Sequence, residues 1–355
     1  MSIEASPKGG VGAPPDSMTN PPPTGERFIW RGNPEQTYSD WTIEIVATAK
    51  YDDARGESNG GELIEETVTT YHVHKALLAS GTTKSEYFAN LFRSRFNESK
   101  SCLSRIELDP LAASAFPALL DYIYAKDGYL DINSNNATAL HYLGEYFDTK
   151  PLRRDALQFC VKDMSLENLH IYYQHATLFQ NESILGILAE FANKSLLDVS
   201  PSAAIIKQAE PKFWVKMLKA LPIETSKLSK RSLHWSKLIP EIGTLHGEAI
   251  DKDTFDKLTN ITVLPTVHHE AALSLCELDD ILHAYNNGEN ELKQENDPDP
   301  NCLQKRCAAA LSQNWRKLAV LEDEVKLLEH RKPVFLAHLL LQSLSLAKKS
   351  LSLRR

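Results

Sequence analysis

The sequence lacks cysteine pairs and long apolar runs. Its five cysteines are scattered and none forms a CxxC pair, so neither a disulfide framework nor a zinc ribbon is expected. No window approaches the roughly 18 uninterrupted apolar residues that a membrane helix needs. The first residues also lack the apolar core of a signal peptide. We therefore expect a soluble protein of the cytoplasm, the nucleus or both, with no membrane contact.

Motifs of catalysis and of nucleic-acid binding are lacking as well. The chain has no glycine-rich phosphate loop, no HExxH and no GxSxG. Its net charge of −8 comes without a basic face for nucleic acid. His268 and His269 are adjacent, and adjacent side chains on a helix diverge by about 100°, so we do not expect them to hold an ion together. The prediction is a non-enzymatic protein without cofactor or metal.

What the sequence does contain is an ordinary globular composition, with 42% hydrophobic and 24% charged residues. Its 355 residues suffice for two or three domains. Residues 1–27 are rich in Pro, Gly and Ser, which predicts a disordered tail. Alternating apolar residues predict strands at 41–47 and 63–73, with a polar loop between them.

After residue 73 the apolar spacing becomes helical. Short helices are expected at 76–79 and after Ser85, which is a suitable N-cap, followed by a short strand at 104–108. Two further helices should begin near Ser114, with Pro117 in the first turn, and near Ser134. A helix should start at Pro151.

From residue 151 onward the pattern predicts only helices of similar length, as in a stacked helical-hairpin array. Helix starts are expected at Ser200-Pro201 and at Pro211. The region 225–285 is predicted to be mostly helical, and 286–300 to be a polar linker. In the C-terminal helices of 301–355, Leu311, Leu318 and Val325 recur every seven residues, which is too short a pattern for a coiled coil and favours packing within the chain.

Four blocks of the N-terminal half resemble the signatures of BTB/POZ domains. They are YHVHKALLA from Tyr71, SEYFANLF from Ser85, AFPALLDYIY from Ala115, and the run from Asn136 to Leu152. The resemblance implies an α+β fold, a BTB/POZ domain over residues 28–160, with a small sheet flanked by helices. The helices of 161–224 resemble, more loosely, the BACK domain that often follows a BTB domain.

The resemblance also assigns roles to residues. It places His74, Lys75 and Phe88 in a structural signature, although His74 alone could be read as a catalytic base or metal ligand. Phe96 and Glu98 match a hydrophobic-x-Glu motif with which BTB proteins bind a cullin scaffold; the alternative is that Phe96 folds onto the core and Glu98 is solvated. The segments flanking that face carry Tyr87, Phe92, Tyr122 and Tyr124.

The function that this implies is a protein-interaction adaptor, with the BTB face on a cullin-type ubiquitin ligase scaffold and the C-terminal helices on an unknown target. The first alternative is a self-associating scaffold, that is, a homodimer without a role in ubiquitination. Family members that form a strand-swapped dimer carry an amphipathic helix before the first strand. The corresponding segment here, residues 28–40, lacks that periodicity and contains Pro34, which argues against a strand-swapped dimer. The second alternative is a ligand-binding or catalytic domain within 225–355, which a deep pocket with convergent polar groups would support.

Overall fold

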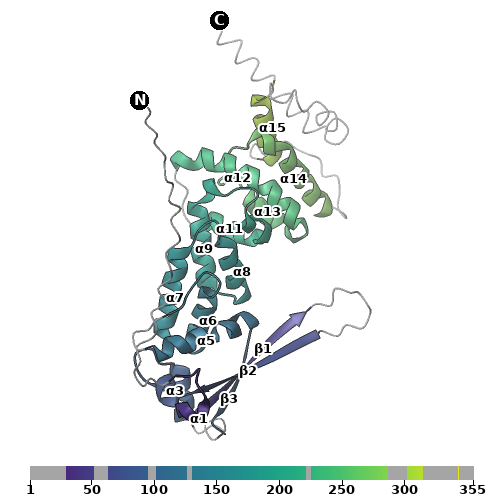
Figure 1. Ribbon diagram of the computed structural model, residues 1–355. Helices are drawn as coiled ribbons and strands as arrows, with labels where there is room; N and C mark the ends of the chain where they lie inside the picture. The colour runs from purple at the N-terminus through teal and green to yellow at the C-terminus, as the bar shows by residue number, and fades with distance from the viewer. Residues whose placement is uncertain are drawn as a thin grey trace, which may run out of the picture.

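The computed structural model describes residues 29–51, 63–94, 101–125, 130–220, 225–286, 302–314 and 343. A three-stranded sheet with its helices lies at one end of an elongated molecule, and further helices stack away from it toward the other end (Figure 1). The hairpin of the two long strands projects sideways from this stack. The α+β domain and the all-α region after it were both expected.

The sheet has the order β2-β1-β3. Strands β1 (Trp41–Tyr51) and β2 (Leu63–Val73) are antiparallel, with Trp41 opposite Val73, and β3 (Leu103–Leu108) runs parallel to β1. Alternation sends Ile43 and Ile45 into the core, where they are fully or almost fully buried. All three predicted strands are confirmed, although β1 extends four residues past the predicted end.

The helices around the sheet are α1 (Pro34–Thr37), α2 (Lys75–Ala79), α3 (Glu86–Arg93), α5 (Pro110–Tyr124), α6 (Ala137–Tyr146) and α7 (Lys150–Asp163). Ser85 is the predicted N-cap of α3: its Oγ accepts the amide proton of Phe88 at 3.2 Å. The predicted start of α5 at Ser114 is wrong. Asp109 caps the helix through Leu111 N–H at 2.8 Å and Pro110 occupies the first turn, so Pro117 lies in the helix interior.

The following helices are α8 (Leu169–Leu178), α9 (Glu182–Lys194), α10 (Ala204–Gln208), α11 (Pro211–Ala220), α12 (Thr225–His246), α13 (Lys252–Leu258), α14 (Ala272–Asn286) and α15 (Leu303–Gln313), with short 3-10 turns at Leu196–Asp198, Gly247–Ala249 and His269–Ala271. The start at Pro211 is confirmed. The start expected at Ser200-Pro201 is wrong, because residues 201 and 202 form a turn and α10 begins at Ala204. None of the helices in the described part of the chain has the length and apolar character to cross a membrane.

The pair α6–α7 and the pair α8–α9 repeat the same local structure at a spacing of 32 residues. Asn136 and Asn168 precede the first helix of each pair; each Oδ1 accepts the amide proton three residues earlier, and each Nδ2 donates to a carbonyl five residues earlier. This loop explains why α6 begins at Ala137 and not near Ser134. The C-cap of each first helix is a phenylalanine, Phe147 or Phe179, and the next residue is left-handed, Asp148 (φ 45°) or Gln180 (φ 50°).

Two hydrophobic cores divide the molecule. The first joins the sheet to α2, α3, α5, α6 and the start of α7. The second includes Ala137 at the start of α6 and the end of α7, and it continues without interruption through α8 to α15. The described residues of 225–286 and 302–314 therefore extend the same helical stack. The predicted tail at 1–27, the linker at 286–300 and the heptad positions after 314 lie outside the described residues, apart from Asn286.

Candidate protein-interaction surface

His74 lies at the junction of β2 and α2, and its ring links three elements. Its Nε2 lies 2.5 Å from the carbonyl of Thr37, and its Nδ1 lies 2.9 Å from the hydroxyl of Tyr124. The same hydroxyl accepts the backbone N–H of His74 at 2.8 Å. These distances fit an arrangement in which Nε2–H donates to the Thr37 carbonyl and the Tyr124 hydroxyl donates to Nδ1. Since His74 is only 5% exposed, this geometry is that of a packed structural residue.

The start of α2 uses a partner that we did not predict. Asp40 Oδ1 accepts the amide proton of Lys75 at 2.8 Å, whereas the side chain of His74 makes no capping bond to the helix. The ammonium of Lys75 lies 4.6 Å from the centre of the Trp41 ring, within the range of a cation–π contact. Lys75 thus ties α2 to β1.

Phe88 is the centre of an aromatic cluster in the first core. It is fully buried and stacks on Phe147 at 5.3 Å and on Phe92 at 5.9 Å between ring centres. Phe92 is half-buried and also meets Trp41 edge-on at 4.8 Å. These contacts hold α3 against the sheet and against the end of α6.

The predicted interaction residues do not form one surface. Tyr122 is 2% exposed and donates its hydroxyl to Asp155 at 3.1 Å; burial, reinforced by that carboxylate, raises the pKa of Tyr122. The hydroxyl of Tyr124 is engaged with His74, and burial raises the pKa of Tyr124 to about 12. Phe96 and Glu98 lie outside the described residues, shortly after the end of α3.

Tyr87 is the predicted residue that reaches an accessible aromatic patch. Its ring lies 6.2 Å from that of Tyr146, which is 41% exposed. Further along the same side, Tyr142 stacks on Phe179 at 4.5 Å with an interplanar angle of 11°. We call these four residues the aromatic shelf. Tyr142 and Tyr146 were not predicted, although their spacing of four places them on one helix face.

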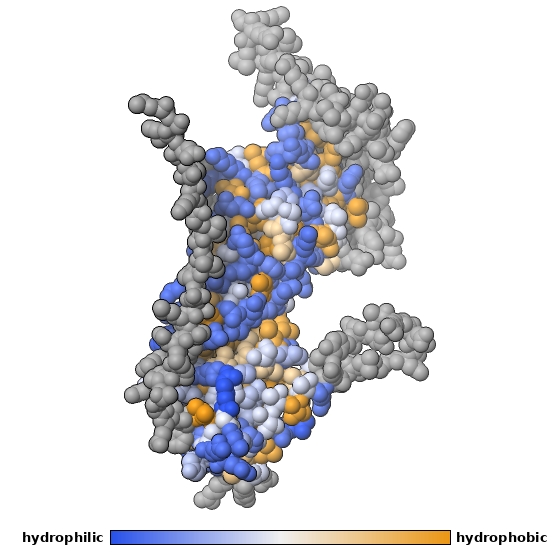
Figure 2. Space-filling view, in the orientation of Figure 1, coloured by the Kyte–Doolittle hydropathy of each residue, from blue (hydrophilic) through white to orange (hydrophobic). Residues whose placement is uncertain are grey.

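The aromatic shelf borders a groove of about 820 Å³ where α6, α7 and the turn between α8 and α9 meet. The groove is lined by Tyr142, Tyr146 and Phe179 and by polar groups that include His141, Arg153 and Glu182. Of the two left-handed turn residues, Gln180 lines the groove. On the face seen in Figure 2, apolar residues gather where the sheet meets the first helices, on a surface that is otherwise largely hydrophilic.

Asn181, which lines the groove, connects α9 to α6. Its Oδ1 caps α9 through Ile184 N–H at 3.0 Å, and its Nδ2 lies 2.9 Å from Nδ1 of His141. Burial lowers the pKa of His141, and the neutral ring can accept this amide proton. The floor of the groove is therefore held by hydrogen bonds between the two helical hairpins.

A smaller hollow of about 420 Å³ lies between α12 and α14. Its lining includes the apolar side chains of Ile250, Leu278 and Ile281 and the carboxylates of Glu241 and Glu277. Two like charges beside apolar side chains supply no mixed acid–base pair, and the Thr244 hydroxyl in the lining donates to the carbonyl of Pro240. This hollow gives no support to a catalytic domain in the region.

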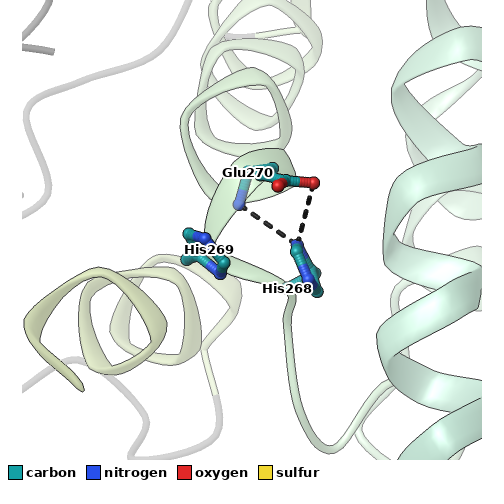
Figure 3. Close-up of side chains that lie close together, drawn as sticks. All are labelled: His268, His269 and Glu270. Carbon is teal, nitrogen blue, oxygen red and sulfur yellow. Dashed lines mark hydrogen bonds and ion pairs between the residues drawn. The ribbon is translucent and has the colours of Figure 1, made fainter. Parts of the chain in front are cut away.

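The expectation that His268 and His269 diverge is wrong. His268 has an extended backbone (φ −77°, ψ 138°) and precedes the 3-10 turn His269–Ala271, so the two residues do not share a regular helix. Their ring centres lie 4.5 Å apart (Figure 3). Together with Glu270 they form a cluster in which the ligand atoms lie within 4.8 Å of one another.

Comparison with known families agrees with this architecture. A family model for the BTB/POZ domain matches residues 63–164, from the start of β2 to the residue after α7. A search of curated proteins finds no match to the chain. The chain therefore contains a BTB/POZ domain, a protein–protein interaction module, followed by an all-α region.

Proposed function

We propose that the chain is a non-enzymatic adaptor that brings a target protein to a cullin-based ubiquitin ligase. The BTB/POZ domain holds the scaffold through the aromatic shelf and the segment after α3, and the BACK-like helices after residue 164 hold the target. The observation that carries the proposal is the exposed Tyr146, which lines the groove and lies 6.2 Å from the partly buried ring of Tyr87. Such a role places the protein in the cytoplasm or nucleus.

The chemistry of the shelf suits protein recognition. Tyrosine rings present a large apolar area at a small entropy cost, and their hydroxyls can still bond at a wet rim. Phe96 follows the last residue of α3 by three positions. In this proposal Phe96 is the apolar anchor and the Glu98 carboxylate fixes the register of the partner.

In this proposal the adaptor raises the rate of ubiquitin transfer by holding the target close to the ligase. A target held on the helical array meets the ligase at the effective concentration set by the distance between the two sites, typically in the millimolar range for short connections. No group of this chain then takes part in a bond-making step. The adaptor needs two separate binding surfaces and a fixed relation between them.

The test is a titration of the chain with the N-terminal domain of a cullin scaffold, followed by calorimetry. Phe96→Ala/Glu98→Ala and Tyr146→Ala should each weaken binding by at least about 30-fold, the loss of a hot spot worth about 2 kcal/mol. Tyr38→Ala is the matched control, because Tyr38 is 82% exposed but lies outside the shelf. Equal binding by all four proteins, or no binding by the unchanged chain, refutes the proposal.

The edge of the sheet favours a second candidate, the self-associating scaffold. Strand β2 lies at the edge of the sheet, and residues 66–70 are all exposed, including Val68 at 48%. An exposed edge can add a strand from a second copy. Light scattering would show a dimer that Val68→Lys converts to monomer, without a change in cullin binding.

A further inference from the structure

The cluster at the start of α14 is composed of three consecutive residues with metal-binding side chains. His268 Nδ1 lies 3.5 Å from Glu270 Oε2, and the His269 ring lies beside that of His268 (Figure 3). His268 Nδ1 also accepts the backbone N–H of Glu270 at 3.3 Å, a hydrogen bond that a metal ion on Nδ1 must displace. His268 and His269 are partly buried, and Glu270 is exposed. A hydrogen bond fixes the backbone of the cluster to α12, since His268 N–H donates to Ser236 Oγ at 2.9 Å.

The separation of one pair of ligand atoms in the cluster matches a metal geometry. Zinc binds imidazole nitrogen and carboxylate oxygen at about 2.0–2.1 Å in a tetrahedral arrangement. Two such ligands are then about 3.4 Å apart. The distance of 3.5 Å between His268 Nδ1 and Glu270 Oε2 already has this value. It is longer than the 2.7–2.9 Å or so of a charge-assisted hydrogen bond between the two groups.

We propose that His268, His269 and Glu270 bind one divalent transition-metal ion of the zinc class. Two imidazoles and one carboxylate suit zinc, nickel or copper, whereas magnesium and calcium prefer an all-oxygen set. With three protein ligands and an exposed carboxylate, water completes the coordination. The ion would fix the turn before α14 against α12.

The ammonium group of Lys237 competes with a metal ion for the Glu270 carboxylate. Its Nζ lies 2.9 Å from Glu270 Oε2, and this ammonium lowers the pKa of the Glu270 carboxyl. The carboxylate is therefore charged and ready to act as a ligand, but a metal ion must displace the lysine. Removal of the ammonium should strengthen metal binding, whereas it would weaken an ordinary surface ion pair.

The experiment is calorimetric titration of the full chain, without a histidine tag, with zinc chloride. Cys102 is exposed and is replaced by serine in every sample, because a thiolate also binds zinc. One zinc ion per chain is expected. His269→Ala and Glu270→Gln should each weaken binding at least about tenfold, the lower end of what even supporting groups contribute to metal sites. Lys237→Gln should strengthen it about twofold to fivefold.

The matched control is His72→Ala, since His72 is a partly buried histidine on β2, far from the cluster in sequence. It should bind zinc as the unchanged chain does, and magnesium chloride should give no heat in any sample. The alternative is that the cluster binds no metal ion and is an ordinary ion pair between a protonated His268 and Glu270. Absence of zinc binding, or equal affinity of His269→Ala, Glu270→Gln and the control, overturns the metal site.

Discussion

Replacement of Tyr124 by phenylalanine removes one hydroxyl from the junction of α1, β2 and α5. That hydroxyl accepts the backbone N–H of His74 and donates to its ring nitrogen Nδ1. The ring of Tyr124 otherwise keeps its shape, so packing is preserved. The substitution tests whether His74 is a structural residue, held by the contacts on both sides of its ring.

The free-energy cost of the substitution comes from the backbone N–H and the ring nitrogen of His74, which lose the Tyr124 hydroxyl as a partner. His74 is 5% exposed, so water does not readily replace the hydroxyl at its amide. A buried donor left without a partner costs about 1–3 kcal/mol. We take a value of about 2 kcal/mol, which corresponds to about a 30-fold change in an opening equilibrium. The effect should be local, because the chain has two hydrophobic cores.

Hydrogen exchange measured by mass spectrometry on peptides covering residues 71–79 is the appropriate assay, since it reports local opening in a chain too large for simple two-state analysis. Protection there should fall about 30-fold, while peptides from α9 and α11 stay unchanged. Tyr146→Phe is the control, because that tyrosine is 41% exposed. A fall of less than about threefold, or the same fall in the control, would refute the structural role of His74.

Three other predictions concern the helices. Asn168→Ala removes the bonds to Ser165 N–H (2.8 Å) and Asp163 (2.8 and 2.9 Å) and should lower stability by about 1–2 kcal/mol, seen as a lower urea midpoint at the same slope. Asn168→Asp keeps the acceptor but places a second carboxylate beside Asp163 Oδ2, so it should lose at least as much stability. Phe147→Ala empties a fully buried site and should cost about 3–5 kcal/mol, measured as a lower melting temperature; a loss below 1 kcal/mol would contradict the packing. Burial lowers the pKa of His141 in the folded chain, so the unfolded chain binds the proton first. Stability should then be full above about pH 6.5 and fall below it, less steeply in His141→Asn.

Local signals in the sequence predicted much of the fold. The alternation at residues 63–73 gave β2 with its exact bounds, and Ser85 marked the start of α3, because strand alternation and side-chain capping involve only neighbouring residues. Pro211 marked a helix start for the same reason. Where two local signals competed, the prediction failed: Ser114 and Pro117 suggested a helix start, but Asp109 and Pro110 provide it.

The accessible surface could not be predicted in the same way. Tyr87 and Tyr146 lie close together because α3 packs against the end of α6. Residue spacing along the chain does not predict that contact. Likewise, Tyr122 lies in a segment that flanks the interaction face in the family, and the sequence does not tell which of these aromatic residues belong to the core; Tyr122 is buried, with its hydroxyl on Asp155 of another helix. The convergence of His268 and His269 depends on an extended residue where a helix was assumed.

Helix α7 links the two halves of the molecule. Leu152 and Ala156 pack into the core of the BTB/POZ domain, whereas Cys160, four residues later on the same helix, packs into the core of the array. One continuous helix of 14 residues, about 21 Å long, thus belongs to both cores. The hairpin α8–α9 repeats the geometry of α6–α7, so it stacks on the domain as one repeat stacks on the next. A target bound to the array would therefore be held at a set distance and direction from the aromatic shelf, because packed helices and not a flexible linker connect the two surfaces.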